Sequence, residues 1–340
     1  MKKKLFIILA IAIFSCESVQ AQLGSYAGAF SRMGFSARGL AMSNSGVSDI
    51  FGDISGINNP ALSSFQNEGK VDLGYTFLNL DRRLNFLGFT KKFKLPKQDK
   101  GGAGITLAWI NAGVSDIDGR DNDTRQIGMF STFENEFYFG TGFLLSEFVS
   151  VGVGFKLYYA KLFEEVTSTS FALDFGGVYK ANDNLAFGIS VKDIGAKYEW
   201  QTSQLYGSNG NTTEDKFPVL LDLGATYFLK KKNTIISLAL QQYFTKTEGD
   251  VENSSSENSN NTVVKLGFET LIVEQVKLRF GIDRVDFSAD DFTGNLKPSA
   301  GFGIHKNFST SINLGVDYSF QLEPFTHNPV QNIGIVFKFK

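Results

Sequence analysis

Residues 149–158 have the sequence VSVGVGFKLY, in which a large apolar side chain occupies every second position. Polar or small residues fill the positions between them. Side chains of a β-strand point alternately to its two faces, so this stretch has one apolar face and one polar or small face. The same period of two recurs in VKLRFGID at 276–283 and in INLGVDYSF at 312–320. These stretches predict strands with two unlike faces.

Segments of this kind follow one another from residue 69 to the last residue. We expect about fourteen strands, near 69–79, 83–93, 102–113, 132–146, 149–162, 166–180, 184–193, 217–230, 233–245, 261–272, 275–286, 295–305, 309–320 and 331–340. Each is roughly 10–15 residues long, whereas a tilted strand needs about 9–11 residues to cross a bilayer and strands of soluble proteins have about 5–6. The sequence therefore predicts an all-β fold, a closed antiparallel barrel in an outer membrane.

Charged residues of both signs lie on the polar faces of these strands. They are Glu134, Glu136, Lys156, Asp174, Lys192, Lys265, Glu269, Arg279 and Asp283. A soluble β-sandwich would also alternate, but its polar face would meet water. Charges mixed closely with Gly are typical of a crowded lumen, where buried charges must be paired.

The lengths of the connections predict the orientation of the barrel. Tight connections are expected near 146–149, 181–184, 230–233, 273–275 and 306–309. Long ones alternate with them, near 113–131, 193–217, 245–261, 286–295 and 320–331, apart from two short connections near 80–83 and 163–166 on the long side. Outer-membrane barrels have short periplasmic turns and longer extracellular loops. An even number of strands then places both ends of the barrel in the periplasm.

Composition excludes several classes of function. The chain has 340 residues, a net charge of −2, one Cys and two His, and it contains 34 Phe and 35 Gly. The near-zero charge argues against a nucleic-acid partner. No nucleophile, metal or phosphate-binding motif is present, so we expect neither an enzyme nor a cofactor or metal. The acidic stretch Asp116–Asp123 could offer oxygen ligands to calcium, or it could be a solvated loop; the loop is the favoured interpretation.

The first 21 residues have the pattern of a secretory signal peptide. Three lysines precede an apolar run of about ten residues and a small-residue cleavage site before Gln22. A lipoprotein signal ending at Cys16 is the alternative. No later window has the roughly 18 apolar residues that would predict a transmembrane helix.

Residues 22–68 do not alternate and are rich in Gly, Ser and Asn. A segment of this length before the first strand is too long for a simple tail. We expect it to form a hatch inside the barrel, which gives three parts: signal peptide 1–21, hatch segment 22–68 and transmembrane barrel 69–340. Asn59-Pro60 is a turn signal at the point where the chain would pass from hatch to wall.

Within this segment, residues 28–65 have the sequence GAFSRMGFSARGLAMSNSGVSDIFGDISGINNPALSSF. It resembles the N-terminal region of the PorV/PorQ family, relatives of the FadL-type fatty-acid transporters. The family pattern falls on Arg32, Gly34, Ala37, Arg38, Met42, Asn59, Pro60 and Ala61. Ser43 departs from it, because relatives usually have Gly after the Met. The resemblance implies a fourteen-stranded barrel with a small hatch in the outer membrane of a Gram-negative-type bacterium.

The same resemblance implies one of two roles. The first is uptake of hydrophobic compounds; the alternative is an accessory barrel of type IX secretion that docks protein cargo at the cell surface. Expected partners are therefore outer-membrane lipid and either a hydrophobic small molecule or secreted protein cargo. A transporter needs an apolar pocket beside the hatch, and the candidate hatch and ligand-binding residues are Phe30, Arg32, Met33, Phe35, Arg38, Met42, Asn59, Pro60 and Ala61. Arg32 and Arg38 are expected to pair with wall carboxylates.

Overall fold

The computed structural model describes residues 26–94, 101–163, 166–245, 260–285, 296–323 and 328–340. The expected signal peptide and its alternative at Cys16 lie outside these residues. No helix in the described part of the chain has the length and apolar character needed to cross a bilayer.

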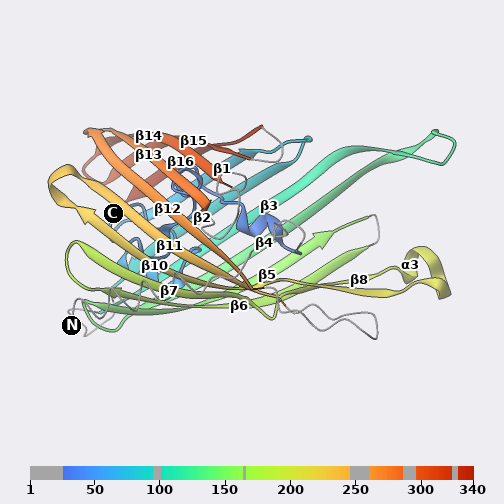
Figure 1. Ribbon diagram of the computed structural model, residues 1–340, viewed down its shortest axis with the longest axis horizontal. Coiled ribbons are helices and arrows are strands. Elements are labelled where there is room, and N and C mark those ends of the chain that lie inside the picture. Colours follow the sequence, from blue (N-terminus) through green and yellow to red (C-terminus); the bar gives the residue numbers. More distant parts are fainter. Residues whose placement is uncertain (1–25, 95–100, 164–165, 246–259, 286–295, 324–327) are drawn as a thin grey trace.

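Fourteen antiparallel strands form a closed barrel (Figure 1), which confirms the predicted fold. The barrel strands are β1 (Gly69–Phe77), β2 (Arg83–Phe93), β3 (Gly102–Arg120), β4 (Gln126–Leu144), β5 (Val149–Lys161), β6 (Thr167–Lys180), β7 (Leu185–Ile194), β10 (Val219–Leu229), β11 (Thr234–Phe244), β12 (Asn260–Val273), β13 (Val276–Val285), β14 (Lys297–Ser309), β15 (Ile312–Leu322) and β16 (Pro329–Phe339). The barrel closes where β1 pairs with β16, with Gly69 opposite Phe339.

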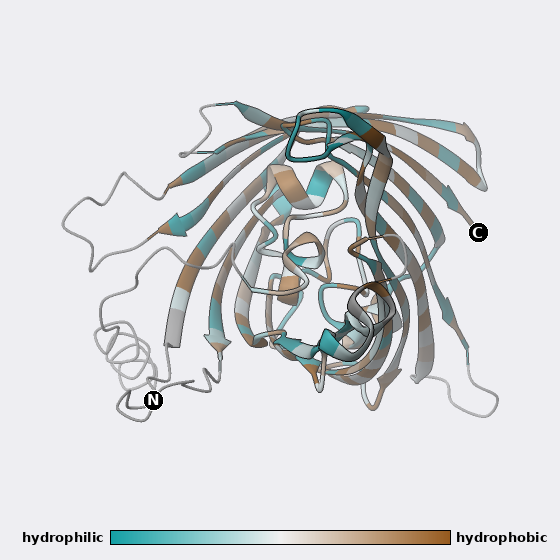
Figure 2. Cartoon of the chain, turned by 90° about the vertical axis from the view of Figure 1, so that its right-hand side faces the viewer, coloured by the Kyte–Doolittle hydropathy of each residue, from teal (hydrophilic) through white to brown (hydrophobic). Residues whose placement is uncertain are grey.

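Alternating burial along the strands shows which face meets the membrane. In β5, Phe155 is 53% exposed, whereas its neighbours Gly154 and Lys156 are buried. Large apolar residues are exposed in the same way on the outside of every barrel strand, and the hydropathy colouring alternates along them (Figure 2). Burying this apolar outer surface in hydrocarbon is favourable, while the closed ladder satisfies the backbone polar groups. The barrel therefore spans a membrane.

Tight connections gather at one end of the barrel. They include the turns after β4, β6, β12 and β14, and the short helix η5 (Lys230–Lys232) after β10. The last strand, β16, also ends there, beside the start of β1. Short turns mark the periplasmic end of an outer-membrane barrel, so we call this end the periplasmic end and the opposite one the extracellular end.

Two predicted loops are wrong at the extracellular end. β3 and β4 stay paired beyond the barrel as far as Arg120 and Gln126, so most of the expected loop 113–131 is a protruding hairpin (Figure 1). The expected loop 193–217 contains the hairpin of β8 (Lys197–Gln201) and β9 (Thr212–Lys216), which pair with each other. The helices α3 (Ser203–Tyr206) and η4 (Gly207–Asn209) form its tip. Beyond the bilayer no lipid imposes alternation, so the sequence pattern weakens although the backbone pairing continues.

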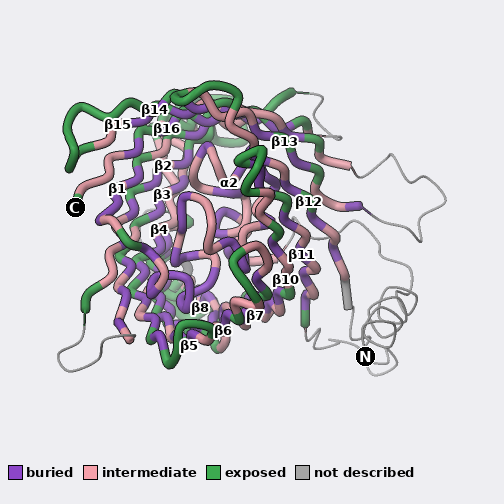
Figure 3. The backbone as a smooth tube through the Cα atoms, turned by 90° about the vertical axis from the view of Figure 1, so that its left-hand side faces the viewer, coloured by how far each residue is buried: buried purple, intermediate pink, exposed green. Residues whose placement is uncertain are grey.

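Residues 26–68 lie inside the barrel and are called the luminal segment (Figures 2 and 3). Its helices are η1 (Ala29–Arg32), α2 (Ala37–Ala41), η2 (Gly46–Ser48) and η3 (Pro60–Phe65). η3 packs against β2 to β6, α2 against β13 to β16, and η2 against β7, β10 and β11. The segment therefore contacts the wall on all sides.

Glycines of the wall admit the luminal segment. A Cβ atom at Gly104 would lie 2.1 Å from the carbonyl group of Ser63, and one at Gly152 would lie 2.4 Å from the backbone nitrogen of Ala61. Any larger residue at these inward positions would displace η3. This close approach explains why Gly is so frequent on the inward faces of the strands.

Candidate functional site

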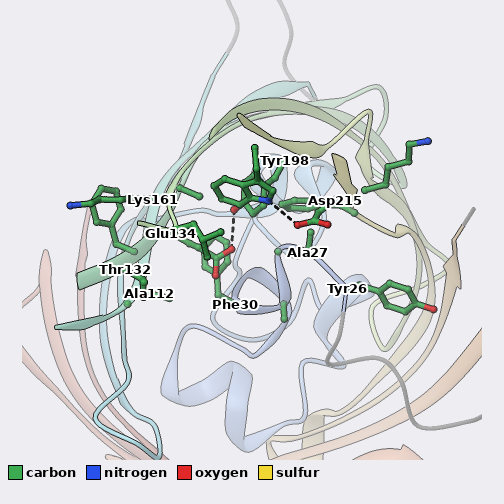
Figure 4. Close-up of a pocket in the computed structure, with 18 of the residues that line it drawn as sticks. Tyr26, Ala27, Phe30, Ala112, Thr132, Glu134, Lys161, Tyr198 and Asp215 are labelled. Carbon is green, nitrogen blue, oxygen red and sulfur yellow. Dashed lines mark hydrogen bonds between the residues drawn. The ribbon is translucent and has the colours of Figure 1, made fainter. Parts of the chain in front are cut away.

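A cavity of about 1020 Å³ occupies the extracellular half of the lumen. Its floor is the start of the luminal segment, including Phe30 and Met33, and its walls come from β3, β4 and β5 (Figure 4). The β8–β9 hairpin closes one side with Tyr198 and Trp200. We call this cavity the chamber. Its size lies at the upper end of the range usual for small-molecule sites.

Five aromatic rings form a continuous chain beside the chamber. Phe30 meets Tyr158 edge-on at 6.2 Å, and Tyr158 lies 4.7 Å from Phe217. Phe217 contacts Tyr198 at 4.8 Å, and Tyr198 contacts Trp200 at 5.1 Å, all measured between ring centroids. All five side chains are buried. The luminal segment, the wall strand β5 and the hairpin thus contribute to one apolar surface.

Polar contacts attach the hairpin to the wall and join its two strands. The Tyr198 hydroxyl donates to the carboxylate of Glu134 on β4 at 3.0 Å, whereas the indole of Trp200 donates at 2.7 Å to Asp215 within the hairpin (Figure 4). Burial, and then the nearby Glu134 carboxylate, raise the pKa of the Tyr198 phenol well above its ordinary value. The phenol is therefore protonated at neutral pH and remains a donor.

The backbone of β8 adds two further bonds to the wall. Its amides at Lys197 and Glu199 donate to the hydroxyls of Ser170 and Ser168 on β6, at 3.0 and 2.8 Å. β8 therefore continues the wall above β6 rather than hanging free in solvent.

A compact polar cluster lies deeper in the lumen, around Lys156. The Lys156 ammonium lies 2.7 Å from Asp193, 3.1 Å from Asp174 and 3.9 Å from Glu136. A bulge in the pairing of β6 with β7 brings Asp193 into this group, since Leu173 pairs with Ile194 but Phe175 pairs with Val191. All four charged side chains are buried. A small polar cavity of about 40 Å³ adjoins them.

A second charged cluster joins the luminal segment to the opposite wall. Arg38 donates to Glu269 at 2.9 Å and to Asp49 at 2.6 Å, and Arg279 donates to the same Glu269 at 2.7 Å. Arg279 also donates to Asp317 at 2.7 Å. Burial alone would lower the pKa of the Arg38 guanidinium, but Glu269, Asp49 and Asp53 together raise it well above its ordinary value.

Asp53 connects this cluster to two wall lysines. Its carboxylate lies 3.2 Å from the ammonium of Lys277 and also pairs with Lys338. Burial would raise the pKa of Asp53, but Lys277, Lys338 and Arg38 hold it well below its ordinary value. The luminal segment is thus held to the periplasmic half of the wall by several paired charges.

Asn59 anchors the corner of the luminal segment at which η3 begins. Its side-chain amide donates to the carbonyls of Val47, Gly177 and Ile189, at 2.9, 3.2 and 3.2 Å. Its side-chain oxygen accepts from the amide of Ala61 at 3.1 Å, which caps η3. Pro60 occupies the first position of η3, where its missing N–H costs nothing.

The structure separates the candidate hatch residues into groups. Phe30 and Met33 line the chamber, and Phe35 packs beside them against Phe86 with ring centroids 5.6 Å apart. Met42 is buried at the end of α2, where its carbonyl lies close to the position of Gly267 on β12, so it is not part of the chamber.

The expected pairing of Arg32 with a wall carboxylate is wrong among the described contacts. Its guanidinium donates instead to the carbonyls of Ala27 and Tyr26, at 3.0 and 3.2 Å. η1 ends at Arg32 and turns the chain back on itself, so these carbonyls are nearer to the guanidinium than any carboxylate of the described residues. Arg38 meets Glu269 as described above.

The remaining lumen charges have partners of other kinds. Lys192 pairs with Asp222 at 2.7 Å, and Lys265 donates to Gln241 at 2.9 Å. Asp283 lies near the extracellular end of β13, where it accepts from the amide of Arg284 at 2.8 Å.

Four residues of the aromatic chain had no place among the sequence candidates. Tyr158 lies on the inward face of β5, as its position in the alternating pattern predicts. Because it is a hydroxyl-bearing residue on the polar face, the sequence gave no sign that its ring belongs to an apolar surface. Tyr198, Trp200 and Phe217 lie in or beside the stretch expected to be a loop. Four aromatic residues within 198–217, Tyr206 among them, were the available signal.

The stretch Asp116–Asp123 belongs to the protruding hairpin of β3 and β4. Arg120 pairs with Asp118 at 2.7 Å, and Asp121 accepts from the amides of Asp123 and Arg125 in the turn, both at 2.9 Å. Within the described residues, no group of three or more acidic or histidine side chains has the arrangement of a metal site. Calcium binding at this loop stays an unsupported alternative.

No protein-family model and no curated protein matches this chain. Solved structures share its fold. The toluene transporter TbuX of Ralstonia pickettii is 12% identical, with a TM-score of 0.58 over 91% of this chain and 99% of that one. The toluene transporter TodX of Pseudomonas putida is 13% identical, with a TM-score of 0.58 over 90% and 97%. A FadL homologue of Pseudomonas aeruginosa is 11% identical, with a TM-score of 0.53 over 89% and 97%.

The class of protein follows from the fold and the outer surface. The chain is an outer-membrane β-barrel with the FadL-type fold, in the outer membrane of a Gram-negative-type bacterium. Membership of the PorV/PorQ family stays a prediction. Two of the solved structures named here are toluene transporters and none is described as a secretion protein, so the secretion role has no support from them.

Proposed function

We propose that this barrel carries hydrophobic compounds across the outer membrane and that the chamber is where they first bind. The observation that supports this most is the chain of five buried aromatic rings beside the chamber, in a lumen whose remaining wall is largely polar. A water-filled pore for polar solutes does not require such an apolar surface. Apolar ligands gain about 25 cal/mol for each Å² of apolar surface removed from water.

In this proposal the luminal segment acts as a hatch. It contacts the wall on all sides, and its paired charges and the Asn59 corner hold it below the chamber. A compound that binds in the chamber must therefore displace part of this segment or pass beside it. Phe30 and Met33 are the hatch residues that a bound compound would touch.

The two tryptophans allow a direct test of binding. Trp200 lines the chamber, whereas Trp109 is 37% exposed on the outside of β3. In the Trp109→Phe protein, reconstituted in lipid nanodiscs, fluorescence reports on Trp200 alone. We expect a saturable change on titration with a monoaromatic hydrocarbon or a long-chain fatty acid.

A matched pair of variants identifies the site. Phe217→Leu removes a ring from the chamber and should weaken binding, because ring contacts contribute about 0.5–1.5 kcal/mol each beyond buried area. Phe175→Leu changes an outward ring that is 46% exposed and should leave binding unchanged. Absence of a saturable signal, or equal weakening by both variants, would refute the proposal.

A further inference from the structure

The outer face of β2, β3 and β4 carries a row of three hydrogen-bonded asparagines near the extracellular end of the barrel. The side-chain amide of Asn85 donates to the side-chain oxygen of Asn111 at 3.1 Å, and that of Asn111 donates to Asn135 at 3.0 Å. The indole of Trp109 donates to the same Asn135 oxygen, also at 3.0 Å. The three asparagines lie opposite one another in the strand register, and their buried strand neighbours point into the lumen. These three residues therefore face the membrane side, and we call them the amide row.

The amide row lies where the apolar outer band of the barrel ends. In register with it, Tyr75 on β1 lies opposite Asn85, and Tyr159 on β5 lies opposite Asn135. One outward position closer to the periplasm, all five strands carry apolar or aromatic side chains, which are Leu73, Leu87, Trp109, Phe137 and Leu157. Tyr and Trp collect at the boundary between hydrocarbon and headgroups in outer-membrane barrels. The amide row is therefore at headgroup depth in the outer leaflet.

Two cations flank the amide row on its extracellular side. Arg83 on β2 and Lys161 on β5 occupy the next outward positions, in register with each other through Gly113 and Phe133. Both border the mouth of the chamber, but strand alternation turns their side chains outward, and Lys161 points away from the lumen in Figure 4. Neither has a carboxylate partner in the described part of the chain. Because neighbouring strands are about 4.8 Å apart, the two cations lie about 14 Å from each other along the sheet.

The two ends of the amide row have unused hydrogen-bonding groups. The side-chain nitrogen of Asn135 and the side-chain oxygen of Asn85 have no hydrogen-bond partner among the described residues. Amide groups without partners are costly in hydrocarbon, so at this depth they favour a ligand with polar groups of its own. We call the amide row, the two cations above it and the apolar positions below it the tiered surface.

We propose that the tiered surface binds lipid A, the phosphorylated and acylated amino-sugar disaccharide that anchors lipopolysaccharide in the outer leaflet. Its sugar hydroxyl and amide groups would meet the amide row. Its two phosphates, which stand at opposite ends of the disaccharide, would lie near Arg83 and Lys161, and its acyl chains would lie along Leu87, Trp109 and Phe137. Arg and Lys form strong charge-assisted hydrogen bonds with phosphate, and their long stems place the charge at headgroup depth. The proposal does not depend on what the chamber binds.

The charges on this face favour an anionic lipid over a second copy of the chain. No acidic residue occupies an outward position in β1, β2, β5 or the parts of β3 and β4 that pair with them, all of which lie within the described residues. Two copies meeting here would bring Arg83 and Lys161 of one barrel against those of the other without a countercharge. A lipid with phosphates supplies that countercharge, and the outer leaflet presents it at high local concentration.

Native mass spectrometry tests the proposal directly. The purified barrel is exchanged into detergent that contains equal amounts of lipid A, dephosphorylated lipid A and phosphatidylglycerol, and the lipids retained on the protein are counted. We expect lipid A to be retained in preference to the other two. In the R83Q/K161Q variant the preference for lipid A over its dephosphorylated form should fall about tenfold or more, because two basic contacts are lost. Asn135→Leu should instead weaken retention of both forms by about fivefold, because the amide row contacts the sugar.

Two matched controls separate a site from general effects of charge and polarity. K231Q/K232Q removes two exposed lysines at a periplasmic turn, and Gln242→Leu removes an outward amide on β11 that accepts a hydrogen bond from Thr262. Both should retain lipid A like the parent barrel, and melting curves check that every variant keeps its fold. Equal retention of the three lipids by the parent, or equal losses in variants and controls, would overturn the proposal. A lipid-free dimer that is lost in Asn135→Leu would also overturn it, because the face would then belong to a second copy.

Discussion

The hydroxyl of Tyr198 donates a hydrogen bond of 3.0 Å to the carboxylate of Glu134, and this bond joins the β8–β9 hairpin to β4 across the edge of the chamber. The two residues come from strands that are not paired with each other. Removing the bond should therefore loosen the hairpin without breaking the barrel ladder.

We expect Tyr198→Phe to increase amide hydrogen exchange in residues 197–216. Loss of one such hydrogen bond costs about 1 kcal/mol, and the barrel's melting temperature should not change. Tyr179→Phe is the control, because Tyr179 is 51% exposed on the outside of β6. Exchange that stays unchanged in Tyr198→Phe would show that the hairpin is held by its apolar contacts alone.

Arg38→Ala should loosen the luminal segment more than it destabilises the barrel. The substitution removes the cation shared by Asp49 and Glu269, and breaking a buried pair costs about 3–5 kcal/mol. Conductance in planar bilayers should rise while the melting temperature changes little, since the wall closes without the segment. Arg120→Ala is the control, because that exposed pair with Asp118 lies on the protruding hairpin.

Deleting most of the luminal segment is a stronger test of whether it blocks the lumen. Removal of residues 26–58 should leave a barrel of high conductance. Unchanged conductance after this deletion would contradict a luminal hatch and would favour a docking role for the segment in the periplasm.

We expect acid to loosen the luminal segment only at low pH. The folded-state pKa of Asp53 lies well below that of an unfolded aspartate, about 3.9. A lowered carboxyl pKa contributes stability that is fully present above the unfolded value and is lost as the pH falls through the folded one. Conductance should therefore stay low from neutral pH to about 4 and should rise only below it.

Asp53→Asn is the matched variant for this pH dependence. It removes the charge that Lys277 and Lys338 contact, so its conductance should be higher at neutral pH and should change less on acidification. A conductance change of the parent protein between pH 5 and 7 would show that another group controls the segment.

Substitutions at neighbouring residues of β5 should have different effects on the barrel, because the two side chains face opposite sides of the strand. Val153→Arg places a charge in lipid near the middle of the strand and should destabilise the barrel by about 2–4 kcal/mol in vesicle refolding titrations. Gly152→Val points inward, where even a Cβ atom would lie 2.4 Å from the Ala61 nitrogen, and should raise conductance by displacing η3. Equal effects of the two substitutions on refolding would contradict the assigned faces.

The local sequence pattern was sufficient to predict the barrel. Alternation with period two, as in residues 149–158, marks which side chains meet lipid, and a bilayer imposes this pattern on every strand that crosses it. Strand number and tight turns could therefore be predicted. The extension of β3 and β4 to Arg120 and Gln126 could not, because outside the bilayer no solvent boundary forces the side chains to alternate.

The candidate site is formed by contacts between residues that are far apart in the sequence. The sequence by itself identified Phe30, Met33 and Arg38 as residues of a luminal segment and Glu269 as a wall carboxylate. Only the tertiary structure paired Arg38 with Glu269, 231 residues apart, and turned Arg32 toward its own backbone. Only closure of the barrel brought Phe30, Tyr158 and Trp200 into one chain of rings beside the chamber, because ring packing depends on where strands meet in space and leaves no periodic pattern in the sequence.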